Sequence, residues 1–119
     1  MPYIIETRFY PRSMYGRVGG LGKVTRHAVA TLDEARDEAA YRIERITGGD
    51  PDYEEVYTDA QGCSELGDTF GPLPDGTVIE VRQVGWDELR DSATREQRDR
   101  GMTAAETIDA YNAAQESGT

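Results

Sequence analysis

The segment from Thr31 to Gly49 reads TLDEARDEAAYRIERITGG and carries the clearest helix signal in the chain. Thr31 followed three residues later by Glu34 is the pattern of a capping box, in which each side chain bonds the main chain of the other residue. Gly48 and Gly49 end the helix, because glycine adopts the left-handed conformation at little cost. The apolar residues recur at helical spacing and predict a helix over 32–47 with one buried face. They are Leu32, Ala35, Ala39, Ile43 and Ile46.

Two strand-like segments precede this helix and one follows it. Residues 3–10 are rich in β-branched and aromatic side chains, which is typical of a strand. Residues 23–30 predict a second strand, antiparallel to the first because the glycine-rich link 11–22 is too short for a crossover helix. The run 77–84, TVIEVRQV, follows the turn signal Pro74-Asp75-Gly76 and predicts a third strand. Alternation along the first strand places four side chains on one face: Tyr3, Ile5, Thr7 and Phe9.

The rest of the chain predicts shorter helices and one long loop. Asp50 and Pro51 look like the cap and first turn of a second helix over 50–61, whereas 62–76 is dense in Gly, Pro and Asp and predicts a loop. A short helical piece is expected at 86–89, and the segment 95–100 is too polar to be buried. A second capping-box pattern at 103–106 starts a last helix with a narrow apolar stripe. That stripe consists of Ala104, Ile108 and Tyr111, with Ala114 as an optional member.

These elements predict a small α+β domain. We expect a mostly antiparallel three-stranded sheet, formed by the hairpin and the third strand, packed by the 32–47 helix and followed by C-terminal helices. A chain of 119 residues fits one domain over 1–119. Residues 90–119 either pack on its core or form a loosely packed helical extension. An open sheet leaves exposed edges, where a second copy or a partner can pair.

The net charge of −10 is divided unevenly along the chain. Residues 1–30 hold five cations and one carboxylate, a net charge of +4, which leaves −14 for residues 31–119. Affinity for phosphates comes mainly from Lys and Arg, so general nucleic-acid binding is not expected. An acidic surface can instead imitate nucleic acid and occupy a basic cleft of another protein.

Compartment and redox chemistry follow from a few residues. No apolar stretch reaches the roughly 20 residues needed to cross a bilayer, and Glu6 and Arg8 stand where a signal peptide would be apolar. Cys63 is the only cysteine, so neither an internal disulfide nor a cysteine-based zinc site is available to one chain. We therefore expect a cytoplasmic protein without membrane contact.

Signals for catalysis and cofactors are weak. The glycine-rich segment 16–25 resembles a phosphate loop, but Arg17 replaces its first glycine and Val24 its final Ser or Thr. His27 is the only histidine and lacks a second ligand at a usable spacing, and Cys63 lacks an identifiable base. Clustered acidic residues follow helix N-termini, where the macrodipole favours them. We assign no catalytic, cofactor-binding or metal residue and do not expect an enzyme.

Basic and aromatic residues are interleaved around the predicted hairpin, a mixture that binds acidic protein surfaces or phosphates. The alternative is that these cations only offset the acidic remainder of the same molecule. The candidate partner-binding residues are Arg8, Arg12, Tyr15, Arg17, Lys23 and Arg26.

Three segments resemble small uncharacterised proteins of actinobacterial phages and prophages: 23–36 (KVTRHAVATLDEAR), 71–81 (GPLPDGTVIEV) and 108–112 (IDAYN). The resemblance implies a phage or mobile-element origin, action in the host cytoplasm, and a role in host takeover or counter-defence. A second likeness, to HicB-type antitoxins, rests on the helix start 31–35 (TLDEA) and the segment 62–69 (GCSELGDT). In that family the glycine-cysteine segment leads into the helix, whereas here it follows the helix, so this likeness bears on topology alone.

The leading functional prediction is a non-enzymatic protein that binds a host or phage protein through its sheet edge, hairpin or acidic helical face. Two alternatives from other classes stay open. One is a structural or assembly protein that forms homodimers or larger oligomers, and the other is a small enzyme or ligand-binding protein whose site is assembled from distant residues.

Overall fold

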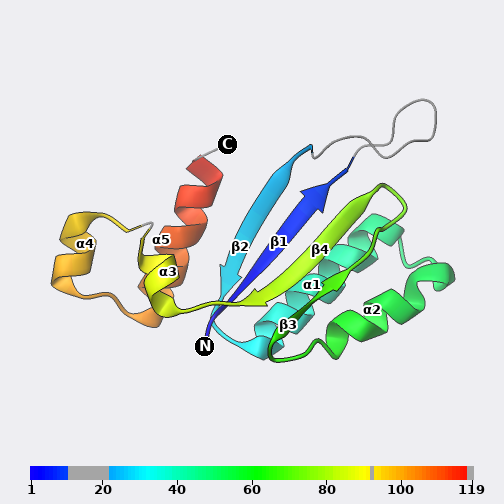
Figure 1. Cartoon of the computed structure of the whole chain (residues 1–119), viewed down its shortest axis with the longest axis horizontal. Coiled ribbons are helices and arrows are strands. Elements are labelled where there is room, and N and C mark those ends of the chain that lie inside the picture. Colours follow the sequence, from blue (N-terminus) through cyan, green and yellow to red (C-terminus); the bar gives the residue numbers. More distant parts are fainter. Residues whose placement is uncertain (11–21, 92, 118–119) are drawn as a thin grey trace.

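The computed structural model describes residues 1–10, 22–91 and 93–117, and it is an α+β fold (Figure 1). Four strands form one antiparallel sheet in the order β2-β1-β4-β3. Among the described residues there are also five α-helices and one short 3₁₀ helix. The strands are β1 (Tyr3–Phe9), β2 (Val24–Val29), β3 (Gly67–Phe70) and β4 (Thr77–Gln83). The helices are α1 (Leu32–Thr47), η1 (Pro51–Tyr53), α2 (Glu54–Gln61), α3 (Trp86–Arg90), α4 (Arg95–Arg100) and α5 (Ala104–Ser117).

The main core lies between one face of the sheet and the pair α1 and α2 (Figure 1). The alternation predicted for β1 is confirmed, because Tyr3 and Ile5 are buried in this core. Further along the same face, Thr7 accepts a hydrogen bond of 2.6 Å from Nη1 of Arg42 on α1. The helix predicted over 32–47 has those bounds, with the Thr31 cap and a left-handed Gly48 at its ends.

A second, smaller cluster lies on the opposite face of the sheet. Ile4, which points away from α1, packs with Ala28 of β2 and with Tyr111 of α5. Leu89 of α3 and Val84 complete the buried part of this cluster. The C-terminal helix α5 therefore packs on strands β1 and β2 near the start of the chain, and it belongs to the folded body of the protein.

The sheet has a fourth strand where the sequence predicts a loop. Residues 67–70 pair with β4, so the predicted α+β class with a mostly antiparallel sheet is confirmed, but the sheet has one strand more than the three expected and part of the predicted loop 62–76 is a strand. Gly67 has φ +96°, and a Cβ atom there would lie 2.2 Å from the carbonyl oxygen of Val81. Glycine is thus required for the close approach of the two strands, although it reads as a loop signal in the sequence.

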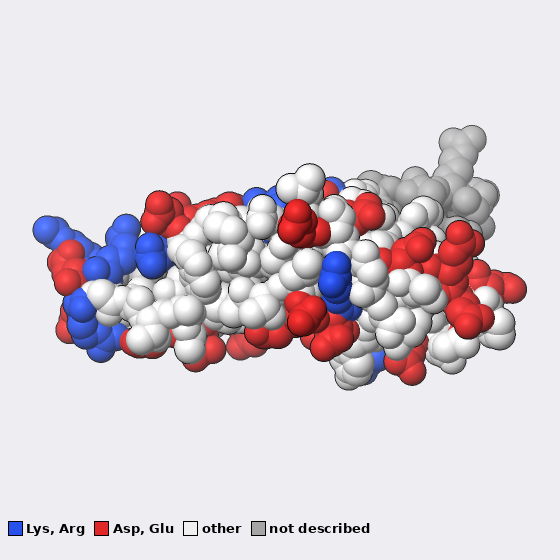
Figure 2. Space-filling view, turned by 90° about the horizontal axis from the view of Figure 1, so that it is seen from below, with Lys and Arg blue, Asp and Glu red and all other residues white. Residues whose placement is uncertain are grey.

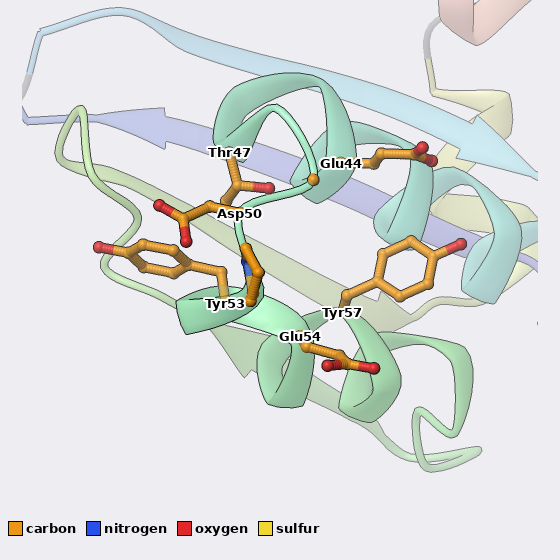
Figure 3. Close-up of a pocket in the computed structure, with 8 residues that line it drawn as sticks. Glu44, Thr47, Asp50, Tyr53, Glu54 and Tyr57 are labelled. Carbon is orange, nitrogen blue, oxygen red and sulfur yellow. The ribbon is translucent and has the colours of Figure 1, made fainter.

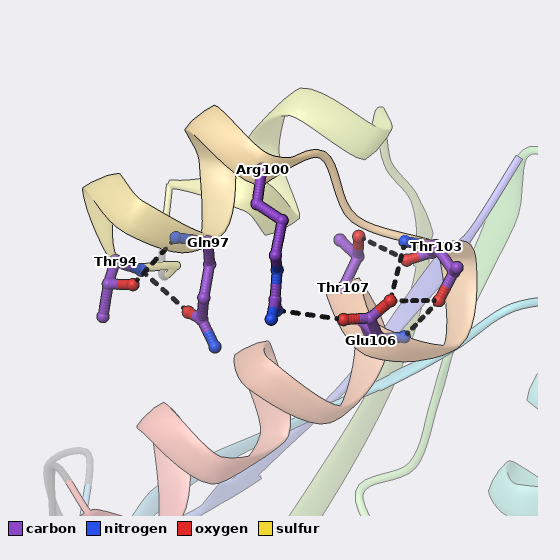
Figure 4. A network of polar contacts seen from close by, with 6 residues as sticks. All are labelled: Thr94, Gln97, Arg100, Thr103, Glu106 and Thr107. Carbon is purple, nitrogen blue, oxygen red and sulfur yellow. Dashed lines mark hydrogen bonds and ion pairs between the residues drawn. The ribbon is translucent and has the colours of Figure 1, made fainter.

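The helices predicted over 50–61, at 86–89 and from 103 are present, and the segment 95–100 forms a further helix that the sequence did not predict. The helix predicted over 50–61 begins as η1, with the Asp50 side chain accepting from the main-chain N–H of Asp52, and continues as α2. The polar segment 95–100 is the helix α4, which has no buried residue and is closed at its start by a Thr94–Gln97 capping box. An exposed ion pair of 3.2 Å joins its Arg100 to Glu106, the residue that caps α5 together with Thr103 (Figure 4).

The molecule is long, and its ends differ in charge. It measures 52 × 30 × 21 Å, and its radius of gyration of 15.7 Å exceeds the roughly 13.5 Å of a compact domain of this length. Carboxylates gather over the end that carries α2, and arginines gather over the end that carries α4 (Figure 2). Among the described residues no helix has both the length and the hydropathy to span a bilayer.

Candidate functional site

Three of the six candidate partner-binding residues lie in the described part of the chain. Arg8 is on β1, Lys23 immediately precedes β2, and Arg26 is on β2. The other three, Arg12, Tyr15 and Arg17, fall in segment 11–21, outside the described residues.

Arg8 and Arg26 belong to a row of alternating charges on the sheet face that α1 does not cover. Nε of Arg26 lies 3.1 Å from a carboxylate oxygen of Glu6. Arg8 lies between two carboxylates, 3.7 Å from Glu6 and 3.6 Å from Glu80. One of these three contacts lies within β1 and the other two join β1 to β2 and to β4, so these two arginines are balanced within the sheet and not by the acidic helices.

Lys23 and Arg26 also form one wall of a groove between β2 and the C-terminal half of α5. The groove has a volume of about 440 Å³, and its opposite wall is formed by the last described turn of α5. Ala114, Gln115 and Glu116 face the strand there. Two segments that lie far apart in the sequence thus enclose one candidate site.

Next to the groove residues in sequence, the side-chain amide of Asn112 joins α5 to the edge of β2. Oδ1 of Asn112 accepts a hydrogen bond of 2.7 Å from the main-chain N–H of Ala28, and its Nδ2 donates one of 3.1 Å to the carbonyl oxygen of the same residue. This pair of bonds is the pattern that a neighbouring strand would make with Ala28. Asn112 therefore takes the place of a neighbouring strand at the Ala28 end of the β2 edge.

At its other end, at Val24 and Arg26, the same edge has no strand partner among the described residues. In an antiparallel pair, residues alternate between facing the partner strand and facing away from it. Ala28 faces away from β1, and the register pairs Ile4 with Ala28, Glu6 with Arg26 and Arg8 with Val24. The main-chain groups of Val24 and Arg26 consequently point into the groove, where the described residues offer them no strand partner.

Asn112 was missed by the sequence reasoning, although the sequence contains a signal for it. The apolar stripe of α5 runs through Ile108 and Tyr111, and a helix brings residue 112 onto the same side as 108. A polar amide within a packing stripe usually bonds a buried main-chain group. That signal identifies the residue type but not its partner on β2.

The two nucleophile or base candidates do not assemble a reactive centre. Cys63 is 1% exposed in the main core, where burial, and secondarily the Asp68 carboxylate, raise the pKa of its thiol while Arg36 opposes the rise. His27 is partly buried on β2, opposite Ile5 in the register. Within the described ranges no group of three or more His, Cys, Asp and Glu side chains is placed to hold a metal ion.

Comparison with known proteins yields no relative: no family model matches the chain, and no curated protein or solved structure matches it significantly. The fold and the groove therefore carry the functional argument by themselves.

Proposed function

We propose that this protein is a non-enzymatic binding module that takes up an extended segment of another protein as an added strand on the β2 edge. The observation that supports it most is the half-closed edge, in which Asn112 occupies the strand position opposite Ala28 while the groove above it leaves Val24 and Arg26 open. Strand addition uses main-chain hydrogen bonds for affinity and alternate side chains for specificity.

The dimensions of the groove suit a short segment. A cavity of about 440 Å³ lies within the usual range of binding pockets and holds a few residues rather than a folded domain. Two outward-facing residues, Val24 and Arg26, offer two N–H groups and two carbonyl oxygens to the incoming chain. Each main-chain bond adds roughly 1 kcal/mol, so the expected complex is of modest affinity.

Charge favours a different protein over a second copy as the occupant. Two copies joined edge to edge would bring Lys23 and Arg26 of one close to the same cations of the other, and like charges on paired strands are destabilising. A partner segment with a carboxylate opposite Arg26 would instead extend the alternating row that Glu6, Arg8 and Glu80 already form. The occupant is therefore an acidic extended segment of another protein.

The similarity to actinobacterial phage and prophage proteins stays a prediction, and within this proposal it makes a host or phage protein the natural partner. A library of random linear peptides, selected for binding to the full chain, tests the proposal without assuming this origin.

Peptides that also bind the variant Val24→Pro are removed by counter-selection, because proline lacks the outward N–H of Val24 and is tolerated at a sheet edge. The matched control is Val24→Ala, which keeps the N–H.

The selected peptide is then methylated on one main-chain nitrogen at a time. Strand addition predicts that binding is lost at alternate residues, which face β2, and kept at the residues between them. Val24→Pro is expected to weaken binding at least tenfold and Val24→Ala less than threefold. Uniform tolerance to methylation, equal binding by Val24→Pro, or no enrichment over the counter-selection would refute the proposal.

A further inference from the structure

A second hollow lies at the acidic end of the molecule, between the end of α1 and the turn into α2 (Figure 3). Its volume is about 370 Å³. Two tyrosine rings, Tyr53 and Tyr57, line it from opposite sides of the η1–α2 turn, as the close-up shows. Glu44 reaches it from α1, and Thr47, Asp50 and Glu54 complete the polar part of the lining.

The two rings are held in place by the fold. Tyr53 and Tyr57 are both partly buried and pack against the main core. The hydroxyl of Tyr57 accepts a hydrogen bond of 3.3 Å from Gln61 one turn later. Gly48, in the left-handed conformation, ends α1 and turns the chain so that η1 follows directly. The aromatic walls are thus present before any ligand binds.

The charge around this pocket is negative and unbalanced. Residues 50–61 contain five carboxylates and no Lys, Arg or His. Neither these five nor Glu44 forms an ion pair with any described residue. The nearest cation in sequence, Arg45, lies over the ring of Tyr41 at 5.7 Å and lines a different hollow. The carbonyl end of α1 adds the negative pole of its helix dipole.

These carboxylates are not gathered closely enough to hold an inorganic ion, because the described residues contain no metal-binding group of three acidic, His or Cys side chains. An organic cation has different requirements. Its charge is spread over a flat or bulky head, which is attracted to aromatic faces and to carboxylates farther apart. Two tyrosines and an unbalanced acidic rim supply both features in one cavity.

We propose that this pocket binds the guanidinium head of an arginine side chain from a protein partner. The site goes beyond the function proposed above, since it shares no residue with the β2–α5 groove and lies on the other face of the sheet. It gives the acidic end of the molecule a defined anchor point for a basic segment. The expected ligand is thus a side chain of another protein and not a free metal ion.

The experiment titrates the isotope-labelled full chain at low salt with Nα-acetyl-arginine amide and follows backbone amide shifts. We expect saturable shifts that centre on Gly49, Tyr53 and Tyr57, with a Kd of about 1 mM, typical of a single small anchor. The matched ligand is the citrulline analogue, which keeps the shape and lacks the charge. Equal shifts with citrulline, shifts centred elsewhere, or no shifts at all would contradict the proposal.

Variants separate the aromatic from the ionic contribution. Tyr57→Leu is expected to weaken arginine binding about threefold to fivefold, whereas Tyr57→Phe keeps the ring and the affinity. Glu44→Gln and Glu54→Gln are each expected to weaken it about threefold, and both residues are exposed, so folding is preserved. Calcium chloride is the last arm: saturation at these carboxylates by calcium at lower concentration than arginine would make the site a metal site and overturn the proposal.

Discussion

Asn112 on the last helix bonds both main-chain polar groups of Ala28 on the edge strand, at 2.7 and 3.1 Å, across 84 residues of sequence. The Asn112 amide thus makes the two main-chain hydrogen bonds that a neighbouring strand would make, and it makes them at Ala28 only. The edge of β2 is closed at Ala28 and open at Arg26 and Val24. The first prediction follows from this division.

Asn112→Ala should lower the free energy of unfolding by about 2 kcal/mol, because two hydrogen bonds are lost and the N–H and C=O of Ala28 are left without their partner. Urea denaturation measures this loss.

Gln115→Ala is the control for that variant, because it removes a side-chain amide from the same helix without touching Ala28. It should change the unfolding free energy by less than about 0.5 kcal/mol, as surface substitutions do. A stability of Asn112→Ala equal to that of Gln115→Ala would show that the amide is not a clamp.

The charged row on the sheet gives a second prediction. Glu6 contacts both Arg8 and Arg26, and its side chain is 15% exposed. Glu6→Gln should therefore cost about 1 kcal/mol, because the well-buried carboxylate is lost, Arg26 loses its counter-charge and the partly buried Arg8 keeps only Glu80. Glu88→Gln, at an exposed pair with Arg82, should cost less than about 0.5 kcal/mol. Equal costs for the two variants, measured by denaturant unfolding, would disprove the ranking.

A third prediction concerns the strand β3. Gly67 and Gly49 both have positive φ, but a Cβ on Gly67 would collide with Val81 whereas one on Gly49 would meet nothing within 4 Å. Gly49→Ala should cost about 1 kcal/mol for the strained conformation alone. Gly67→Ala should cost about 2–4 kcal/mol, because the steric conflict with β4 is added. Thermal unfolding of the two variants gives the difference, and similar values would contradict the required close approach.

That glycine also explains where sequence reasoning failed on the fold. The helix over 32–47 and the strand beginning at Tyr3 could be predicted, because each has a regular apolar period and the helix also has its caps. Residues 67–70 have no such period: of the four, only Phe70 is buried. Pairing with β4 decides their structure, and pairing is a long-range property that a window of four residues does not contain.

The candidate site was predictable in part for a similar reason. Lys23 and Arg26 are predictable as candidates because they belong to the basic residues that alternate with aromatic ones around the hairpin, and both line the groove. Their opposite wall, 114–116, carries no composition signal, and its position follows from the packing of Tyr111 against Ile4 and Ala28. Local sequence therefore identified one wall, and tertiary packing supplied the other wall and its Asn112 boundary.

The buried thiol gives a pH prediction. Burial raises the pKa of Cys63 above that of a free cysteine, so the unfolded chain loses this proton at lower pH than the folded chain does. The contribution of the protonated thiol to the free energy of unfolding is complete below about pH 8.5, the pKa of a free cysteine. It is lost as the pH rises through the higher pKa that Cys63 has in the folded chain. Unfolding free energies of the native chain should fall more steeply over this range than those of Cys63→Ala.

Tyr111 is accounted for in the same experiment, because burial also raises the pKa of its hydroxyl. Cys63→Ala is therefore measured in the native and in the Tyr111→Phe background, so that the two contributions are subtracted separately. A difference between Cys63→Ala and its parent that stays constant with pH would show that the thiol is not shielded from water.

Because the two apolar clusters lie on opposite faces of the sheet, we expect them to open as two separate cooperative units. The five buried residues of the smaller cluster secure α3 and α5, while α1 and α2 rest on the larger one. Partial opening of the small unit would release α5 and leave the main core folded. In native-state hydrogen exchange, the amide of Ala28 should exchange faster than that of Ile79. The equilibrium between packed and released α5 would then decide how much of the β2 edge is accessible to a partner.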